Sequence, residues 1–350
     1  MIHERSTGTA PFRGGCERRR PVWAPPRPET EGVRQAREAR PEVAARRPPQ
    51  LRNVLVPVDG SPAAEHALPY ALALARRSGA EVSLVNVYST LQAANDPERL
   101  GWHGGEYLVE PLRDYLDGLA RRVADACHVR VRPVLLKGDW PEDAIGRAVD
   151  WGADLVVMAA RRRGWWSRVW HGSVSAEVAA RSRVPVLLVP GRDQPPVLTD
   201  EPPLSRVLVP LDGSARAERT LGPAVALAAL SNGECDLLRV VRSRPYVVDW
   251  SLAYGGRRTS PSVEQTRAAH QYLRGVVGRL RARGVSTRWR VVADERPTAE
   301  AITGYAELRG ADVIAMSRRG GVGLEGFFRG SLATRVARLA PVPVLTCRTT

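Results

Sequence analysis

The sequence predicts an α/β protein made of two tandem doubly wound domains, each a five-stranded parallel sheet with helices on both faces. Two observations predict this class. Short Val- and Leu-rich runs such as "DLVVM" and "VPVLLV" suit strands that are buried on both faces, and they alternate with segments of helical periodicity. The whole alternation then occurs a second time along the chain. The first observation predicts a parallel sheet, and the second predicts two of them.

The repeat is visible in the residues themselves. "NVLVPVDGSPAAEHALPYALALA" from Asn53 is answered by "RVLVPLDGSARAERTLGPAVALA" from Arg206, an offset of 153 residues. The segment "GADLVVMAARRRGWWSRVWHGSVSAEVAARSRVPVLLVP" is answered by "GADVIAMSRRGGVGLEGFFRGSLATRVARLAPVPVLTC", with Met316 standing 158 residues after Met158. A nearly constant offset indicates a tandem duplication. We expect a disordered Pro- and Arg-rich tail, a first domain, a Pro-rich linker and a second domain, at 1–50, 51–190, 191–204 and 205–350.

The elements of each copy follow from the periodicity. In the first copy the strands are expected near 53–59, 81–88, 129–136, 154–159 and 184–190. The helices between them are expected near 62–78, 106–126, 141–151 and 173–182. In the second copy the strands are expected near 206–211, 235–241, 286–292, 312–316 and 342–347.

Composition narrows the function classes. The formal net charge is +15, but nearly all of the basic residues are Arg, with Lys137 as the single Lys, and they are spread through the chain. Nucleic-acid binding is therefore the last of the functions we consider. The cysteines lack C-x-x-C spacing and the six His are dispersed, which favours free thiols over a zinc or disulfide framework. No apolar run reaches membrane length and the N-terminus lacks a signal-peptide pattern, so we expect a cytoplasmic protein.

The first strand of each copy ends in V-P-[VL]-D-G-S, with Asp59 and Asp212 at the strand end. Ligands of open α/β sheets bind beyond the carboxyl ends of the strands, where these carboxylates lie. Ser61 and Ser214 can cap the following helices, and Pro62 suits a first helical position. A carboxylate here can accept hydrogen bonds from an adenine amino group or a ribose hydroxyl. It can equally cap the helix and complement its dipole, and the sequence leaves both readings open.

A glycine-spaced loop follows the fourth strand of the second copy. Ser317-Arg318-Arg319-Gly320 is followed by nine residues and then by Gly330-Ser331, which opens a helix. Glycines let backbone N–H groups approach phosphate oxygens, and a helix N-terminus adds unpaired donors. The neighbouring basic residues suit a phosphate-facing cluster or a solvated surface, and their place beside the loops favours phosphate; they are Arg161, Arg162, Arg163, Arg318 and Arg319.

With these motifs, both copies resemble universal stress protein domains over about 51–190 and 205–347. Nucleotide-binding members of that family carry G-x2-G-x9-G-[S/T] after the fourth strand and an Asp at the end of the first. The resemblance implies ATP lying across the strand ends and dimerisation through the last strand. In the second copy it assigns the base and ribose to Pro210, Asp212 and Val240, and the phosphates to Ser317, Gly320, Gly330, Ser331 and Leu332.

The first copy departs further from the family pattern. Its equivalent residues are Pro57, Asp59, Val87, Gly138, Ala159, Arg162, Gly172, Ser173 and Val174. Arg162 replaces a loop glycine, where it can block backbone approach to phosphate or bind phosphate itself. At the position equivalent to Gly138, the second copy has Asp294, a carboxylate close to the expected phosphates. We favour the second copy as the nucleotide site, because backbone access in the phosphate loop is harder to replace than one flanking glycine.

These observations lead to an adenine-nucleotide-binding stress-response sensor or regulator, taking ATP with or without Mg²⁺, with little or no turnover. No Walker A motif and no G-x-S-x-G elbow occur, so an enzyme is not expected, although weak ATPase activity stays open. The alternative is a scaffold that acts through protein contacts, with the Trp-rich loop as its contact surface. The tryptophans of this loop can equally pack against the other copy or the following helix; they are Trp165, Trp166 and Trp170. We expect the two domains to pair through the strands "VPVLLV" and "VPVLTC". A homodimer of such chains is a further level of assembly that we consider, and we expect no contact with a membrane.

Overall fold

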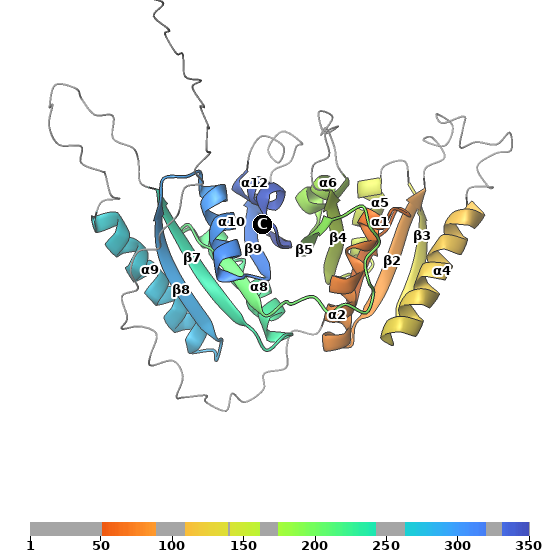
Figure 1. The fold of residues 1–350 in the computed structure, drawn as a ribbon, viewed down its shortest axis with the longest axis horizontal. Coiled ribbons are helices and arrows are strands. Elements are labelled where there is room, and N and C mark those ends of the chain that lie inside the picture. The colour runs from red at the N-terminus through yellow and green to blue at the C-terminus, as the bar shows by residue number, and fades with distance from the viewer. Residues whose placement is uncertain are drawn as a thin grey trace, which may run out of the picture. The chain divides into compact units, whose positions relative to one another are not determined.

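The computed structural model describes residues 51–88, 109–138, 141–161, 174–242, 263–319 and 331–349. Strands and helices alternate twice along the chain, as predicted (Figure 1). The first repeat contains β1 (Asn53–Pro57), α1 (Pro62–Glu65), α2 (Leu68–Ser78), β2 (Glu81–Tyr88), α4 (Val109–Cys127), β3 (Val131–Lys137), α5 (Pro141–Asp150), β4 (Leu155–Arg161), α6 (Val174–Arg181) and β5 (Val186–Gly191). The second contains β6 (Arg206–Pro210), α7 (Ala215–Glu218), α8 (Leu221–Ala229), β7 (Glu234–Arg242), α9 (Val263–Arg281), β8 (Thr287–Asp294), α10 (Thr298–Arg309), β9 (Val313–Arg319), α12 (Leu332–Leu339) and β10 (Val344–Thr349).

The strands form a ten-stranded sheet in the order β3-β2-β1-β4-β5-β10-β9-β6-β7-β8. Within each repeat the neighbouring strands are parallel, and the pair β5–β10 is antiparallel. Chain order reverses between β1 and β4 in the first repeat, and between β6 and β9 in the second. Such switch points are where open α/β sheets bind ligands, beyond the carboxyl ends of the strands.

Helices cover both faces of the sheet, which confirms the predicted fold class. On one face α2, α4, α8 and α9 pack on the strands and form a continuous apolar cluster that draws residues from both repeats, including Leu72, Leu119 and Leu273. On the other face each repeat has a cluster of its own. Residues of α5 and α6 such as Ile145 and Val178 pack on the first repeat. Residues of α10 and α12 such as Ile302 pack on the second.

The segment 62–78 is not the single helix that its periodicity predicts. It is divided into α1 and α2 by His66 and Ala67. A continuous helix would require a hydrogen bond from Pro69, which has no N–H, and would press its ring against the carbonyl of Glu65. The second repeat divides at the same place, between α7 and α8, where Pro223 stands three residues into α8.

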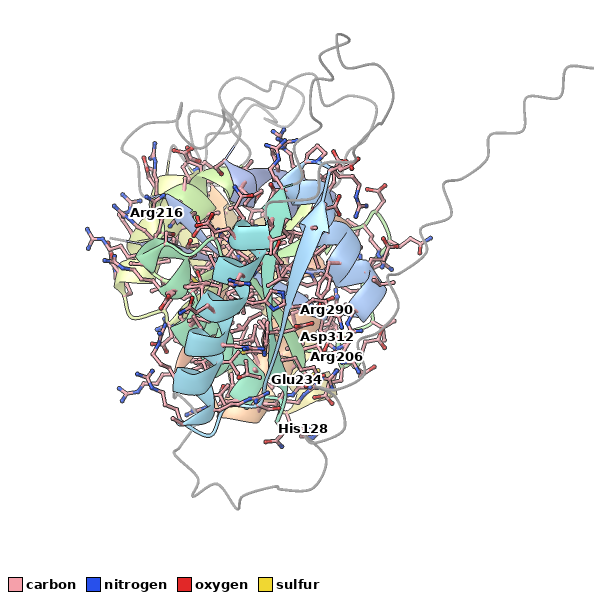
Figure 2. The ribbon with its side chains drawn as sticks, turned by 90° about the vertical axis from the view of Figure 1, so that its left-hand side faces the viewer. His128, Arg206, Arg216, Glu234, Arg290 and Asp312 are labelled. Atoms are coloured by element: carbon pink, nitrogen blue, oxygen red, sulfur yellow. The ribbon has the colours of Figure 1, made fainter. Side chains whose placement is uncertain are left out.

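At the amino edge of the sheet, one aspartate in each repeat anchors the first strand. Asp154 Oδ2 accepts from the backbone N–H groups of Arg52 (2.6 Å) and Asn53 (3.0 Å). Asp312 Oδ2 accepts from the N–H groups of Ser205 and Arg206 at 2.9 and 2.8 Å and from the Ser205 hydroxyl at 3.0 Å. Figure 2 labels Asp312 and Arg206 close together at this edge. The Asp of the repeated G-A-D sequence is therefore structural, and it lies at the opposite end of the strands from the predicted site.

Candidate site at the carboxyl edge of the strands

The Asp-Gly-Ser turns after β1 and β6 have the same geometry. Asp59 Oδ1 accepts from the N–H and the hydroxyl of Ser61 at 2.9 and 2.5 Å, and Asp212 Oδ1 accepts from Ser214 at the same two distances. Gly60 and Gly213 both have φ +84°, a left-handed conformation that a glycine adopts without strain. Each carboxylate is therefore held in a fixed orientation above the end of its strand.

The helix-capping role belongs to the serines rather than to the aspartates. Ser61 Oγ accepts from Ala64 N–H at 3.2 Å, and Ser214 Oγ accepts from Ala217 N–H at the same distance. Pro62 occupies the first turn of α1, as predicted. The neighbouring serines thus cap the helices, so the capping reading does not hold for Asp59 and Asp212. Within the chain, the two aspartates order the turn.

Arg239 on β7 lies beside the turn of the second repeat. Its Nη1 donates to the carbonyl of Leu211 at 3.2 Å. Partial burial alone would raise the pKa of Asp212, but the hydrogen bonds from Ser214 and the nearby Arg239 charge hold that pKa below its usual value. Asp212 is therefore ionised at neutral pH. In the first repeat the position of Arg239 is taken by Asn86, which is buried.

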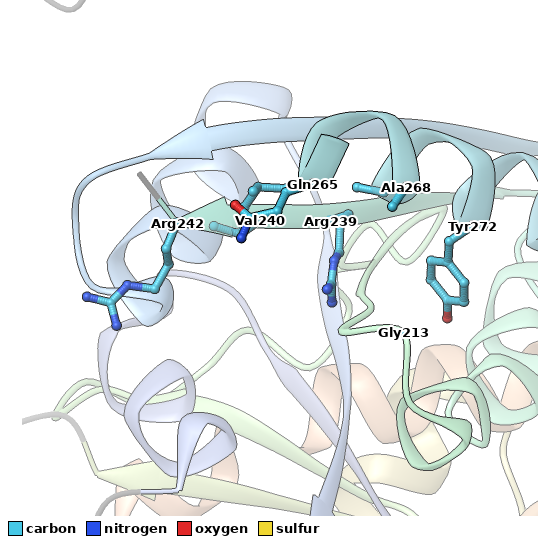
Figure 3. A pocket seen from close by; sticks show the side chains of 9 residues that line it. Gly213, Arg239, Val240, Arg242, Gln265, Ala268 and Tyr272 are labelled. Carbon is cyan, nitrogen blue, oxygen red and sulfur yellow. The ribbon is translucent and has the colours of Figure 1, made fainter. Parts of the chain in front are cut away.

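A cavity of about 860 Å³ opens at this point of the second repeat. It lies between the end of β7, the first turns of α9 and the turn at Gly213 (Figure 3). In Figure 3 the side chains of Arg239, on β7, and Tyr272, on α9, both extend toward the Gly213 loop, whereas Arg242 extends to the side. The complete lining is Gly213, Arg239, Val240, Val241, Arg242, Gln265, Ala268, Ala269 and Tyr272.

Of the predicted base and ribose residues of the second repeat, Val240 lines this cavity, whereas Pro210 and Asp212 shortly precede the lining residue Gly213. Pro210 ends β6, Asp212 begins the turn, and Val240 forms part of the cavity wall. In the first repeat Pro57 and Asp59 stand at the end of β1, and Val87 lies near the end of β2. Burial raises the pKa of Tyr272, and the neighbouring carboxylate of Glu218 raises it further, so this phenol is neutral when it faces the cavity.

Gly138 has a packing reason to be glycine. Its N–H donates to the carbonyl of Tyr88 at 3.0 Å. A Cβ at this position would lie 2.8 Å from Cβ of Ala144 and 3.5 Å from Val87, which is too close to the first of these. The residue therefore lets α5 approach the end of β3. This need is independent of any ligand.

Asp294 of the second repeat occupies the equivalent place, and its carboxylate is paired within the chain. Arg296 donates to it from Nη2 at 2.7 Å, from Nε at 3.1 and 3.2 Å, and from its backbone N–H at 2.9 Å. Burial alone would raise the pKa of Asp294, but the bonds from Arg296 keep that pKa below its usual value. On the neighbouring strand Arg242 stands in register with Asp294. The local charge is therefore balanced rather than negative.

The helix that follows the glycine-spaced loop begins as predicted. Ser331 is the N-cap of α12: its Oγ accepts from Thr334 N–H at 3.2 Å and lies 2.7 Å from Thr334 Oγ1. Leu332 is the first residue of α12, and Ser317 lies near the end of β9. Both therefore lie at the carboxyl edge of the second repeat. Gly320 and Gly330 are outside the described residues.

In the first repeat the described part of the corresponding loop is its two ends. Ala159 lies on β4, and Val174 is the first residue of α6. Arg161 is the last residue of β4. The other predicted residues of this loop lie outside the described ranges, and so does the Trp-rich segment: Arg162, Arg163, Trp165, Trp166, Trp170, Gly172 and Ser173.

The expectation that Arg318 faces phosphate is wrong. Its side chain is only 2% exposed. Its guanidinium donates to the backbone carbonyls of Ala180 and Ser182, at the end of α6 in the first repeat. Residues alternate between the two faces of a strand, so Arg318 lies with Met316 on the face that α6 and α12 cover, while Ser317 lies on the opposite face.

Sequence reasoning missed three residues of the site: Arg239, Tyr272 and Arg296. A signal was present for the first, because an Arg interrupts the apolar strand "CDLLRVV" where the first repeat has Asn86. Tyr272 lies in a helix with many polar residues, so its inward direction had no sequence signal. Arg296 stands two residues after Asp294, a spacing that suits a local ion pair.

Two further classes of feature are missing from the part of the chain that the structure describes. None of its helices combines the length and apolar character needed to cross a bilayer. No three His, Cys, Asp or Glu side chains in the same ranges gather closely enough to hold a metal ion. The cysteines in these ranges, Cys127, Cys235 and Cys347, are free thiols, as predicted, and all are buried.

The fold and the strand-end site define a tandem doubly wound α/β protein with its polar turns and helix N-termini at the carboxyl edge of each parallel half-sheet. Residues 50–190 and 203–348 each match the universal stress protein family. Together these two matches cover most of the chain. The chain belongs to the universal stress protein family.

Individual relatives agree with this assignment. A universal stress protein of Thermus aquaticus is 32% identical over 150 residues, which cover 40% of this chain and 98% of that protein. One from Mycolicibacterium smegmatis is 24% identical over 308 residues, covering 84% of this chain and 96% of the relative. The crystal structure of a universal stress protein from Archaeoglobus fulgidus superimposes with a TM-score of 0.62 at 23% identity, covering 85% of this chain and 97% of that one. This last likeness concerns the fold.

Proposed function

We propose that this protein binds an adenine nucleotide, ATP with or without Mg²⁺, and that the second repeat holds the principal site. The observation that carries the proposal is the cavity between Gly213, Val240 and Tyr272. It opens at the carboxyl edge of the sheet, beside a carboxylate whose orientation is fixed by its turn. Pockets that are partly apolar and carry a few fixed polar groups are the usual sites of small ligands.

The residues present suit the parts of such a ligand. The cavity has the apolar wall and the aromatic ring that a base requires, from Val240 and Tyr272. Asp212 is ionised and can accept from a ribose hydroxyl or an amino group. The phosphates would lie against the loop that runs from Ser317 to Leu332, where the N-terminus of α12 offers unpaired N–H groups. When bound, Mg²⁺ would offset phosphate charge.

The family pattern and the charge balance both favour the second repeat. Asp294 was the residue that counted against it, and Arg296 offsets that charge. In the first repeat Arg162 stands in place of a loop glycine, so we propose a weaker site there. The remaining residues proposed for that site are Pro57, Asp59, Val87, Gly138, Ala159, Gly172, Ser173 and Val174.

We further propose that the protein is a sensor or regulator in the stress response, with little or no turnover. Its place would be the cytoplasm. Residues 51–190 and 205–350 would be its two domains, joined by 191–204 and preceded by the tail 1–50. The domains would pair through β5 and β10, and a dimer of chains would be a further level of assembly. The antiparallel register of β5 and β10 supports that pairing.

The first experiment is mass determination of any nucleotide carried through purification, followed by calorimetric titration of the full chain with ATP. The variant Gly330→Asp places a carboxylate in the loop of the second repeat, and Gly172→Asp does the same in the first. Gly222→Asp is the matched control, because a Cβ at Gly222 meets nothing within 4 Å. We expect Gly330→Asp to abolish the main binding event and Gly222→Asp to leave it unchanged.

The remaining outcomes separate the alternatives. If the unmodified chain binds no adenine nucleotide with or without Mg²⁺, the proposal is wrong and a scaffold acting through protein contacts is favoured. If only Gly172→Asp abolishes binding, the first repeat is the site. A single-turnover assay with ATP and Mg²⁺ tests the expected lack of hydrolysis, since product formation at a rate well above that of the protein-free control would make the protein a slow ATPase.

A further inference from the structure

Among the described residues, Arg318 is the largest side chain that is almost completely buried, and it contacts both repeats. It lies on β9, next to β10, whose antiparallel partner is β5 of the first repeat. The register of that pair is Val344 with Leu188, Leu345 with Leu187 and Thr346 with Val186. The contacts of Arg318 lie beside this three-pair register and add to the apolar cluster that both repeats share.

The acceptors of Arg318 are the last carbonyls of α6. Its Nη2 lies 2.6 Å from the carbonyl oxygen of Ser182, and its Nη1 donates to the carbonyl of Ala180. Arg348 on β10 adds a longer contact, with Nη1 3.4 Å from the carbonyl oxygen of Arg181. The C-terminus of a helix carries unsatisfied carbonyls and the negative end of the helix dipole, so it suits cations.

Burial lowers the pKa of Arg318 to about 10, and the nearby charge of Arg348 acts in the same direction. The group is therefore still protonated at neutral pH. A buried cation is costly unless the groups around it replace water, and the carbonyls at the end of α6 do so here.

The arrangement is not symmetric between the repeats. Where the second repeat has Arg318 and Arg348, the first has Ala160 and Pro190. The helices α6 and α12 also differ in charge. In α6 the buried Glu177 binds Arg181 at 2.6 Å, and Arg181 also lies 2.7 Å from Asp143. At the position of Glu177, α12 has Arg335, followed by Arg338.

The β10 edge of one chain would therefore pair poorly with the β10 edge of a second chain. It would bring Arg318 and Arg348 of one copy toward a helix whose charged residues are Arg335 and Arg338. Like charges repel, whereas the basic residue in the last turn of α6, Arg181, is already paired with Glu177 and Asp143. We propose that Arg318 makes the edge of the second repeat specific for the β5–α6 edge of a first repeat, and against a second copy of itself.

This inference rests on the proposed pairing of the repeats, and its test separates the two. Hydrogen exchange is measured by mass spectrometry on the full chain and on Arg318→Met, which keeps the bulk and removes the charge and donors. We expect exchange in 186–188 and 344–346 to be about tenfold faster or more in the variant, with β1, β2 and β7 unchanged. Arg283→Ala, an exposed Arg in a turn of the second repeat, is the control and should exchange as the unmodified chain does.

A second pair of variants tests the charge argument. Glu177→Gln should accelerate exchange in the same two segments several-fold, because it removes the acidic group of α6. Arg335→Gln, at the equivalent position of α12, should not. If β5 and β10 are protected in the unmodified chain but Arg318→Met leaves their exchange unchanged, or accelerates it equally in every strand, the role of Arg318 is wrong. If those amides are already unprotected in the unmodified chain, the pairing itself is wrong.

Discussion

The guanidinium of Arg296 holds the carboxylate of Asp294, with 2.7 Å between Nη2 and Oδ2. The relationship matters because Asp294 stands where the first repeat has Gly138, at the edge where phosphates are proposed to bind. A bare carboxylate there would repel a nucleotide, and a paired one does so much less. The pair thus makes the second repeat compatible with an anionic ligand.

We predict that Arg296→Met weakens ATP binding about threefold to tenfold at low ionic strength, because Asp294 is then left without its cation. Asp294→Gly, which introduces the residue of the first repeat, should bind at least as tightly as the unmodified chain. Titration calorimetry at low and high salt checks both. Equal affinities for all three proteins would show that Asp294 lies outside the electrostatic reach of the ligand.

Asp312 should be important for stability and not for binding. Asp312→Ala removes an acceptor shared by two backbone N–H groups and a hydroxyl, so we expect the free energy of unfolding to fall by about 2 kcal/mol. Urea denaturation followed by circular dichroism measures this change. Asp200→Ala, at an exposed position, is the control and should lie within about 0.5 kcal/mol of the unmodified chain. ATP affinity of folded Asp312→Ala should be unaltered.

Two glycine substitutions within ten residues should act in opposite directions. Gly138→Ala should lower the free energy of unfolding by about 1–3 kcal/mol, since the new Cβ would lie 2.8 Å from Cβ of Ala144. Gly146→Ala, inside α5, meets nothing within 4 Å and should raise stability by up to about 1 kcal/mol. Thermal denaturation of both variants provides the comparison. A neutral Gly138→Ala would mean that α5 moves away without cost.

The buried thiols should be inert in the native state. Burial raises the pKa of Cys235 and of Cys347 to about 12, so little thiolate is present near pH 8. We expect iodoacetamide to leave both unmodified, and to label both once the chain is unfolded in guanidinium, as read by peptide mass spectrometry. The pKa values of these thiols are higher in the folded than in the unfolded chain. Burial of the neutral thiols therefore contributes fully to stability below about pH 8.5, and this contribution declines as the pH rises toward 12. Rapid native labelling of either thiol would contradict this burial.

Most of the architecture could be predicted because it depends on local patterns that are repeated. The strand positions and the caps at Ser61 and Ser214 both follow from short stretches of sequence. The division of α1 from α2 could also have been predicted from Pro69. In contrast, Arg318 finds its acceptors at Ala180 and Ser182, more than 130 residues earlier in the chain. No spacing rule connects such residues, so its adjacent loop suggested the wrong partner.

Arg239 shows the other limit of the sequence argument. The alternation of a strand predicts that Arg239 and Val240 point to opposite faces, but it does not tell which side chains close the space above them. Tyr272 reaches that space from α9, a helix separated from β7 by residues outside the described ranges. The cavity is therefore a product of tertiary packing.

Among the strands that the structure describes, the outermost two, β3 and β8, each pair on one side only. Exposed on β3 are Arg132, Pro133 and Lys137, and exposed on β8 are Arg288, Arg290 and Ala293. Proline has no N–H to donate to a new neighbour, and two such cationic margins repel each other. Growth of the sheet from chain to chain into a filament is thereby opposed at both of its edges.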